Sequence, residues 1–216
     1  FENTEAGLRA MKQRVAGLTL LERGIRTMAR AGLRSITVLC PSGGETMLSP
    51  IARKLEAEIA FVTWESAAGD SDSQEGHLLL WGDHVHHHSS LSELLEVGLG
   101  PHELIVHAGQ PHQGAKLPVR LNQAKTGPGA VKEDGLASTG AFLCAAGVFT
   151  PSTIATNACS LETQIGEGID GVQFELHRST KDLWRRVVDR STSCSAKNML
   201  FGQVTKTTSG FISRNI

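Results

Sequence analysis

The residues best suited to chemistry stand directly after an apolar run. Residues 77–81 are His-Leu-Leu-Leu-Trp, and Gly82-Asp83-His84 follow them. Ligands of open α/β sheets bind beyond the carboxyl ends of strands, so we expect Asp83 to lie at a ligand site. Its carboxylate is a hard oxygen ligand suited to Mg²⁺, and Gly82 would let a phosphate or a base approach the backbone. The alternative is a buried strand followed by an ordinary polar turn.

A long segment rich in Gly, Pro, Gln and Lys supplies the basic side chains. It spans residues 110–138 and carries Lys116, Arg120, Lys125 and Lys132. Structureless loops of this length inside a compact domain are uncommon and often functional. We expect this loop to lie beside a substrate, and a merely solvated loop stays open as the alternative.

Four histidines, at positions 84, 86, 87 and 88, raise the question of zinc. Imidazole suits zinc, but adjacent histidines on a strand point to opposite faces, and no cysteine lies nearby. The sequence favours solvated turn histidines over a dedicated zinc site. It also contains no Gly-x-Ser-x-Gly segment, Walker A loop or Gly-x-Gly-x-x-Gly segment. Phosphate chemistry assisted by Mg²⁺ at Asp83 is compatible with what remains.

Composition limits the class of protein. The chain has 216 residues, 40% of them hydrophobic and 20% charged, as in one globular domain. A net charge of −1 gives no field that would attract nucleic acid or an acidic membrane surface. No apolar run reaches the ~18 residues that cross a bilayer. The four cysteines are scattered without a Cys-x-x-Cys pair, which favours a reducing, cytoplasmic setting.

Hydrophobic periodicity predicts an α/β domain. Strand-like runs are expected at residues 35–40, 59–64, 77–81, 103–107, 139–144 and 172–176. Helices are expected after Thr19, Ser49-Pro50, Ser90, Pro151 and Ser179, with capping boxes at Thr19/Glu22 and Ser90/Glu93. Residues 1–14 have no clear pattern, and 65–76 are expected to form a loop. The alternation predicts a mostly parallel sheet between helices in three layers.

The C-terminal segment, residues 191–216, differs from the rest. It is rich in Ser and Thr, it contains basic residues, and it has no Asp or Glu. We expect a domain over residues 1–190 and, over 191–216, a linker toward a further C-terminal domain of a longer protein.

Four segments carry a resemblance to a known family. Residues 15–23, 81–85, 138–142 and 179–182 resemble nucleotidyltransferases of the MobA-like or sugar-phosphate type. The nearest resemblance is to inositol-1-phosphate cytidylyltransferase domains fused to a membrane CDP-alcohol phosphatidyltransferase. Residues 206–216 resemble the junction that leads into that membrane domain. The resemblance implies a Rossmann-like nucleotidyltransferase fold and transfer of a cytidylyl group from CTP to a polyol phosphate.

The resemblance also implies site residues. Asp83 would be the catalytic Mg²⁺ ligand, and a list of substrate-binding positions follows: Gly82, His84, Lys125, Thr139 and Gly140. The chain departs from the family pattern at two places. Ala6-Gly7-Leu8-Arg9 only partly matches a Gly-x-Gly-x-Arg phosphate loop, and Met11-Lys12-Gln13-Arg14 lacks the prolines that follow it. The second metal carboxylate is expected near His177-Arg178, where neither residue is acidic.

Two functions therefore stay open. The first is Mg²⁺-dependent cytidylyl transfer from CTP to a sugar or polyol phosphate of the inositol-1-phosphate type. The second is a catalytically degenerate platform domain of a membrane CDP-alcohol phosphatidyltransferase. Both imply a domain at the cytoplasmic face of the membrane, attached only through the C-terminal domain, with no nucleic acid as partner. A homodimer is one open oligomeric state.

Overall fold

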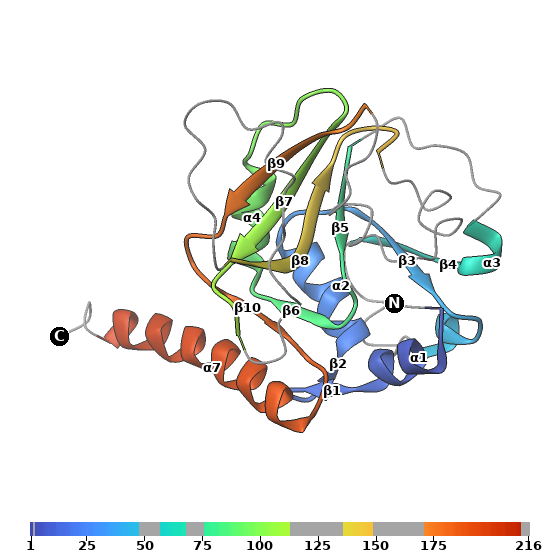
Figure 1. The fold of residues 1–216 in the computed structure, drawn as a ribbon. Helices are drawn as coiled ribbons and strands as arrows, with labels where there is room; N and C mark the ends of the chain where they lie inside the picture. Colours follow the sequence, from blue (N-terminus) through green and yellow to red (C-terminus); the bar gives the residue numbers. More distant parts are fainter. Residues whose placement is uncertain (2, 48–56, 68–75, 113–135, 149–170, 213–216) are drawn as a thin grey trace.

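Helices and strands of the chain form a layered α/β body (Figure 1). The computed structural model describes residues 1, 3–47, 57–67, 76–112, 136–148 and 171–212. The described helices are α1 (Glu5–Lys12), α2 (Leu20–Arg30), α3 (Trp64–Ala67), α4 (His88–Leu95) and α7 (Arg190–Ile212), with a 3₁₀ turn at Gly44–Met47. The described strands are β1 (Arg14–Val15), β2 (Leu18–Thr19), β3 (Ser35–Cys40), β4 (Glu58–Thr63), β5 (His77–Leu80), β6 (His84–His86), β7 (Glu103–Gly109), β8 (Ala137–Cys144), β9 (Gln173–Arg178) and β10 (Trp184–Arg186).

The central sheet has four strands in the order β5-β8-β7-β9. Strand β8 runs antiparallel to both β5 and β7, whereas β9 is parallel to β7. Strands β5, β7 and β9 therefore point the same way, and their carboxyl ends lie at one edge. Strands β3 and β4 form a second, parallel pair. The predicted α/β fold with a mostly parallel sheet is confirmed, with β8 as the antiparallel member.

Two clusters of buried side chains cover the faces of this sheet. Leu91 and Leu94 of α4 pack on Ile105 of β7 and Leu143 of β8. The next residues along β7 point to the opposite face, because side chains alternate along a strand, and they build a second cluster with Phe142. Helix α4 therefore lies against the same face as the odd-numbered side chains of β7.

The helix predicted after Thr19 forms as expected. The Thr19 hydroxyl accepts a hydrogen bond from Glu22 N at 3.2 Å, and Glu22 Oε2 accepts one from Thr19 N at 3.1 Å. Leu21 and Ile25 are buried toward the β3 side of the domain. Gly32, at φ +104°, follows the end of α2, where the left-handed backbone favours glycine. This capping box is confirmed atom for atom.

The second predicted capping box is wrong. Helix α4 begins three residues earlier than expected, at His88, and its N-cap is His87, whose ring nitrogen Nδ1 accepts from Ser89 N. Ser90 is therefore a fully buried residue inside the helix. An imidazole at the N-cap satisfies a free amide in the same way as the expected hydroxyl.

The helix predicted after Ser179 is also wrong. Strand β10 stands there instead and pairs antiparallel with β6. Leu183, Trp184 and Val187 have a spacing that fits a helix, but Trp184 is completely buried as part of a strand. The late helix begins only at Arg190. Asp189 caps its start, because Asp189 Oδ1 accepts a hydrogen bond from Thr192 N at 2.8 Å.

The two chain ends are more regular than expected. Residues 5–12 form α1, with Thr4 as its N-cap, although no pattern predicted a helix there. Residues 190–212 form one long helix, α7, whose buried Ala196 and Met199 join the cluster around Val85 and Val187. The boundary at residue 190 stays a prediction.

Some predicted elements fall outside the described residues. These are the helix after Ser49-Pro50, most of the 110–138 segment with its basic side chains, and the helix after Pro151. Among the residues that are described, no helix combines the length and the apolar character needed to cross a membrane.

Replacing Gly140 by alanine should strongly destabilise the fold. Gly140 has φ +77°, and a Cβ there would lie 2.7 to 2.9 Å from ring atoms of His84 and Trp81. We expect Gly140→Ala to lower the free energy of unfolding by roughly 2–4 kcal/mol, measured by urea unfolding. Gly17→Ala is the matched control, because Gly17 has φ +84° with nothing within 4 Å of the added Cβ. It should cost only about 1 kcal/mol, and equal losses would contradict the packing argument.

Candidate functional site

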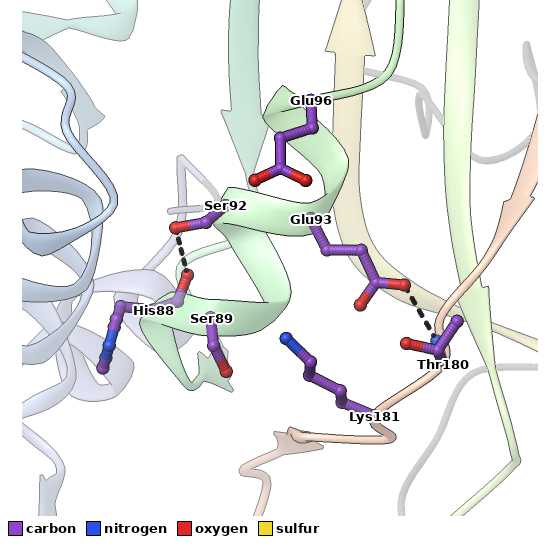
Figure 2. Close-up of a pocket in the computed structure, with 7 residues that line it drawn as sticks. All are labelled: His88, Ser89, Ser92, Glu93, Glu96, Thr180 and Lys181. Atoms are coloured by element: carbon purple, nitrogen blue, oxygen red, sulfur yellow. Dashed lines mark hydrogen bonds between the residues drawn. The ribbon is translucent and has the colours of Figure 1, made fainter.

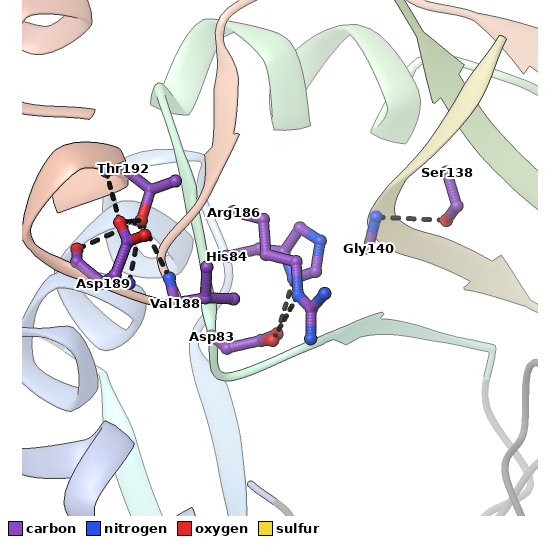
Figure 3. Close-up of polar contacts among 8 residues, drawn as sticks. All are labelled: Asp83, His84, Ser138, Gly140, Arg186, Val188, Asp189 and Thr192. Carbon is purple, nitrogen blue, oxygen red and sulfur yellow. Dashed lines mark hydrogen bonds and ion pairs between the residues drawn. The ribbon is translucent and has the colours of Figure 1, made fainter. Parts of the chain in front are cut away.

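Asp83 lies at the carboxyl edge of the sheet, in the short turn between β5 and β6. The antiparallel pairing of β6 with β10 places His84 opposite Arg186, and Val187 N donates to the Asp83 carbonyl oxygen at 2.8 Å. The ladder thus brings Arg186 beside a residue that precedes it by 103 positions. Figure 3 shows the three side chains of Asp83, His84 and Arg186 turned toward one another.

Each oxygen of the Asp83 carboxylate contacts a different partner. His84 Nδ1 lies 2.6 Å from Oδ1, and Arg186 Nε donates to Oδ2 at 2.7 Å. The Asp83 side chain is 26% exposed and the Arg186 side chain 20% exposed, so water screens this ion pair only partly. We call these three residues the Asp83 triad.

The pKa of Asp83 reflects both its burial and its partners. Burial alone would raise this pKa, but the hydrogen bond and charge of His84 and those of Arg186 lower it well below its ordinary value. The carboxylate is therefore ionised near neutral pH, and its charge is balanced by the Arg186 guanidinium.

The triad does not fit Mg²⁺. This ion is held by carboxylate oxygens at 2.0–2.1 Å together with waters and substrate phosphates. Here each Asp83 oxygen already has a partner, and a guanidinium lies where a second cation would meet Oδ2. Among the described residues, no group of three or more His, Cys, Asp or Glu side chains is arranged to hold a metal ion.

The second carboxylate expected near His177-Arg178 does not lie at this site. His177 sits on β9, where its ring stacks on His107 and lies 3.8 Å from Glu93. The strand that precedes the late helix and lies beside Asp83 is β10, and its residue at the carboxylate is Arg186. Because the segment after Ser179 forms β10 and not a helix, the residue that this part of the chain brings to Asp83 is Arg186.

Several of the predicted substrate-binding residues are packed against other side chains of the protein. The Gly82 backbone lies against the Phe1 ring, since a Cβ at Gly82 would be 2.5 Å from that ring. Gly140 lies against His84, and Thr139 is fully buried with its hydroxyl 2.8 Å from His107 Nδ1. Lys125 lies outside the described residues. A substrate role for these positions stays a prediction.

Four imidazoles form a feature that sequence reasoning missed. His84 and His86 are buried on β6 rather than solvated in a turn, and their ring centroids lie 6.4 Å apart. His107 and His177 are register partners on β7 and β9, stacked at 5.8 Å. We call these four residues the histidine cluster. One sign of this cluster was present in the sequence: His107 and His177 hold similar positions within two predicted strands.

Two members of the histidine cluster are held in the neutral form. Burial, helped by the charge of His177, lowers the pKa of His107 to about 4, although Glu93 opposes the shift. Burial, followed by the charges of His84 and His107, lowers the pKa of His86 well below its ordinary value, while the Thr139 backbone opposes the shift. Neither imidazole is therefore charged near neutral pH.

A separate groove lies between α4 and the residues after β9 (Figure 2). It has a volume of about 430 Å³ and polar walls that include Ser89, Ser92, Glu93 and Lys181. Glu93 Oε1 accepts from Thr180 N at 3.2 Å. Burial would raise the pKa of Glu93, but the Thr180 hydrogen bonds and the charge of His177 lower it. The groove shares no residue with the Asp83 triad.

The Asp83–Arg186 pair should be a strongly coupled interaction. Replacing one partner leaves a largely buried charge without its counter-ion, so we expect Asp83→Ala and Arg186→Ala each to cost about 2–4 kcal/mol. A double-mutant cycle by urea unfolding should give a coupling of about 1.5–3 kcal/mol. Arg178→Ala, which removes an exposed arginine of β9, is the control partner and should show almost no coupling to Asp83→Ala. Similar coupling for Arg178 would refute a specific pair.

Stability should fall as the pH drops below about 6.5. Because the pKa values of His86 and His107 are lowered in the folded protein, the unfolded chain binds more protons below its ordinary histidine pKa. Each histidine then contributes a slope of up to about 1.4 kcal/mol per pH unit. Urea unfolding between pH 7 and 5 measures this slope, and His107→Asn should reduce it.

His102→Asn is the control for that titration, because His102 is exposed and at φ +58°, a conformation that asparagine tolerates. This change should leave the pH slope as it is. An unchanged slope in His107→Asn would show that His107 does not cause the acid sensitivity.

Comparison with known proteins gives relatives in structure alone. No protein-family model matches the sequence, and no curated protein matches it. Among solved structures, the chain is similar to the inositol-1-phosphate CTP transferase from T. maritima, with a TM-score of 0.62 at 13% identity, over 91% of this chain and 94% of that one. It is also similar to a UDP-glucose pyrophosphorylase complexed with UDP-glucose, with a TM-score of 0.59 at 13% identity, over 94% and 97% of the two chains.

A third similar structure is the 4-diphosphocytidyl-2C-methyl-D-erythritol synthase from Anaerococcus prevotii. Its TM-score is 0.55 at 13% identity, over 88% of this chain and 92% of that chain. Identities this low establish a shared fold and leave the activity open. The chain therefore has the Rossmann-like α/β fold of the nucleotidyltransferases.

Proposed function

We propose that this nucleotidyltransferase-fold domain does not catalyse Mg²⁺-dependent transfer and serves as a platform for a membrane CDP-alcohol phosphatidyltransferase in the same polypeptide. The observation that carries the proposal is the ion pair between Arg186 and Asp83. A metal-dependent transferase needs its carboxylate to face Mg²⁺ and the nucleotide phosphates. In this chain that carboxylate faces a guanidinium of the protein itself.

The segment that resembles a phosphate loop supports the proposal. Ala6-Gly7-Leu8-Arg9 lie inside helix α1, and the Gly7 amide donates to the Thr4 hydroxyl at 3.1 Å. A phosphate loop binds through backbone amides that point at the ligand. Here the N-cap residue Thr4 takes two of these amides, because the Leu8 amide also donates to it, through the Thr4 carbonyl oxygen at 3.1 Å. The amides of Gly7 and Leu8 are therefore engaged within the helix and are not directed at a triphosphate.

The C-terminal helix supports the platform role. The first turns of α7 pack on the domain through Ala196 and Met199, and the helix then extends away from the body (Figure 1). Residues 206–216 resemble the junction that leads into a membrane CDP-alcohol phosphatidyltransferase. A helix anchored in this way would hold the domain at a fixed position beside that membrane domain, at the cytoplasmic face.

Cytidylyl transfer from CTP to a polyol phosphate is the second candidate. It is favoured by the position of Asp83 at the carboxyl end of β5, in a fold shared with the inositol-1-phosphate CTP transferase from T. maritima. For this activity the Asp83 carboxylate would first have to separate from Arg186. The ion pair therefore makes the platform the better-supported function.

One assay on the full-length polypeptide separates the two functions. Wild-type protein and Asp83→Ala are mixed with CTP, Mg²⁺ and inositol 1-phosphate, and pyrophosphate release is measured. We expect no release that depends on Asp83, because its carboxylate is already paired with Arg186 and His84. Pyrophosphate released by the wild type and lost in Asp83→Ala would overturn the proposal.

A second experiment on the full-length polypeptide tests the platform role. Deleting residues 1–190 removes the platform domain. We expect the deletion to lower either the rate of phosphatidyl transfer in membranes or the amount of the membrane protein, by several-fold. Arg9→Ala, at an exposed position of α1, is the control and should change neither quantity. Full transfer and full abundance after the deletion would contradict a platform.

A further inference from the structure

Helix α2 carries a row of arginines on the side that faces away from the core. Arg23, Arg26 and Arg30 follow one another at i, i+3 and i+7, so they lie on one face of the helix, opposite the side chains that α2 buries. We propose that these arginines and Lys181 form a surface that binds the anionic phosphates of a lipid bilayer. We call these four residues the basic face. The proposal deepens the proposed function, on which it rests, by naming the surface that the domain turns toward the membrane.

The three arginines lie close enough to one another for their charges to interact. Burial lowers the pKa of Arg23, and the charges of Arg26 and Arg30 lower it further. The Arg23 guanidinium is held by the carbonyl oxygen of Val15, to which its Nη2 donates at 2.6 Å. Among the described residues, no carboxylate lies within ion-pair distance of Arg26 or Arg30. The described part of the fold therefore gathers like charges on this face without pairing them.

Lys181 extends the basic face to the start of α4. The Thr27 hydroxyl donates to the His86 carbonyl oxygen at 3.4 Å, which places the arginine side of α2 beside the first turn of α4. Burial lowers the pKa of His87, and the charges of neighbouring basic residues, Lys181 and Arg30 among them, lower it further. Lys181 and Arg30 therefore lie close to the same imidazole. Figure 2 shows the Lys181 side chain reaching toward α4.

The acidic residues around the basic face limit where an anion can bind. Glu22 is the one acidic residue of α2, and its carboxylate is held in the capping box at the N-terminal end of the helix. Glu93 and Glu96 line the groove beside Lys181, and Glu93 Oε1 accepts from Thr180 N. These two carboxylates would repel a phosphate from the groove. A broad anionic surface over α2 therefore fits the charges better than a small anion inside the groove.

The size of the basic face favours a membrane as its partner. Each basic side chain near an anionic bilayer strengthens binding by about fivefold, so a cluster of this size gives only weak binding. Weak binding suffices for a partner that is already nearby, because attachment through one polypeptide supplies a high effective concentration. Under the proposed function the bilayer is such a partner, and the basic face would decide which side of the domain lies on it. The whole chain has a net charge of −1, so this attraction is local.

The experiment is sedimentation of this chain with vesicles at millimolar lipid, made of phosphatidylcholine alone or with about one third phosphatidylserine. We expect binding to the anionic vesicles only, and a several-fold loss of binding when the salt rises from about 0.05 to 0.3 M, because salt screens exposed charges. Arg26→Ala should weaken binding by about threefold to fivefold, and Arg26→Ala with Arg30→Ala by about tenfold or more. Alanine favours a helix, so α2 should stay intact, which circular dichroism checks.

Arg178→Ala is the matched control, because it removes the same charge at an exposed position of β9. The preceding residue, His177, faces Glu93 of α4, and side chains alternate along a strand, so Arg178 points to the other side of the sheet. This change should leave vesicle binding as it is. Lys181→Ala is the second informative variant and should weaken binding about as much as Arg26→Ala.

The proposal is overturned if the wild type does not bind anionic vesicles, or if the variant that lacks both Arg26 and Arg30 binds them equally well. It is also overturned if Arg178→Ala weakens binding as much as Arg26→Ala does. A short DNA duplex that binds more tightly than the vesicles at the same salt would contradict the choice of a membrane.

These outcomes are separate from those of the proposed function. Failure to bind vesicles removes the basic face as a membrane contact and leaves a platform that is held by α7 alone. Pyrophosphate release that depends on Asp83 removes the platform, whatever the vesicles bind.

Discussion

The ion pair between Arg186 and Asp83 joins the last third of the chain to its middle. Strand β10 reaches the sheet edge beside β6, and the pair closes this contact where the chain turns toward α7. Trp184, two residues earlier, is completely buried and would collide with any Cβ at Gly109. The pair and the tryptophan together place α7 on the domain, because only three residues separate Arg186 from the start of that helix. The position of β10 and of the first turns of α7 therefore depends in part on the carboxylate of Asp83, the residue that was expected to bind a metal.

In this site a side chain of the protein itself, Arg186, takes the place that a bound cation could have at Asp83. A buried carboxylate needs a compensating cation, and either a metal ion or a guanidinium can supply it. The metal leaves coordination positions for phosphates, whereas arginine is permanently charged and fixed by its own backbone. Two further observations act in the same direction: the Phe1 ring lies against the Gly82 backbone, and residues 5–12 form helix α1 and not a loop. The triad, the covered glycine and the helical loop segment together favour a domain that supports a neighbour.

Local patterns predicted much of this fold, and the failures have a common cause. The Thr19 capping box and the strands at 35–40 and 103–107 depend on nearby residues, so the sequence predicted them well. The segment around Trp184 has a spacing that suits a helix, but its pairing with β6 decides its structure, and that partner lies about a hundred residues away. Asp83 was placed correctly at a strand end, whereas Arg186 was not recognised as its partner. Gly82 was identified as a position of close approach, and the group that approaches is Phe1.

The most direct test of the central claim is paramagnetic broadening of the wild-type protein by Mn²⁺, followed in ¹H–¹⁵N spectra. A bound Mn²⁺ broadens the signals of nuclei around it, so the amides of His84 and Val187 and the side-chain Nε–H of Arg186 report on the Asp83 carboxylate. We predict that these signals keep their intensity at millimolar Mn²⁺, both alone and with CTP, because Arg186 already neutralises Asp83. Selective loss of these signals, reversed by EDTA, would place a divalent ion at Asp83 and contradict the account.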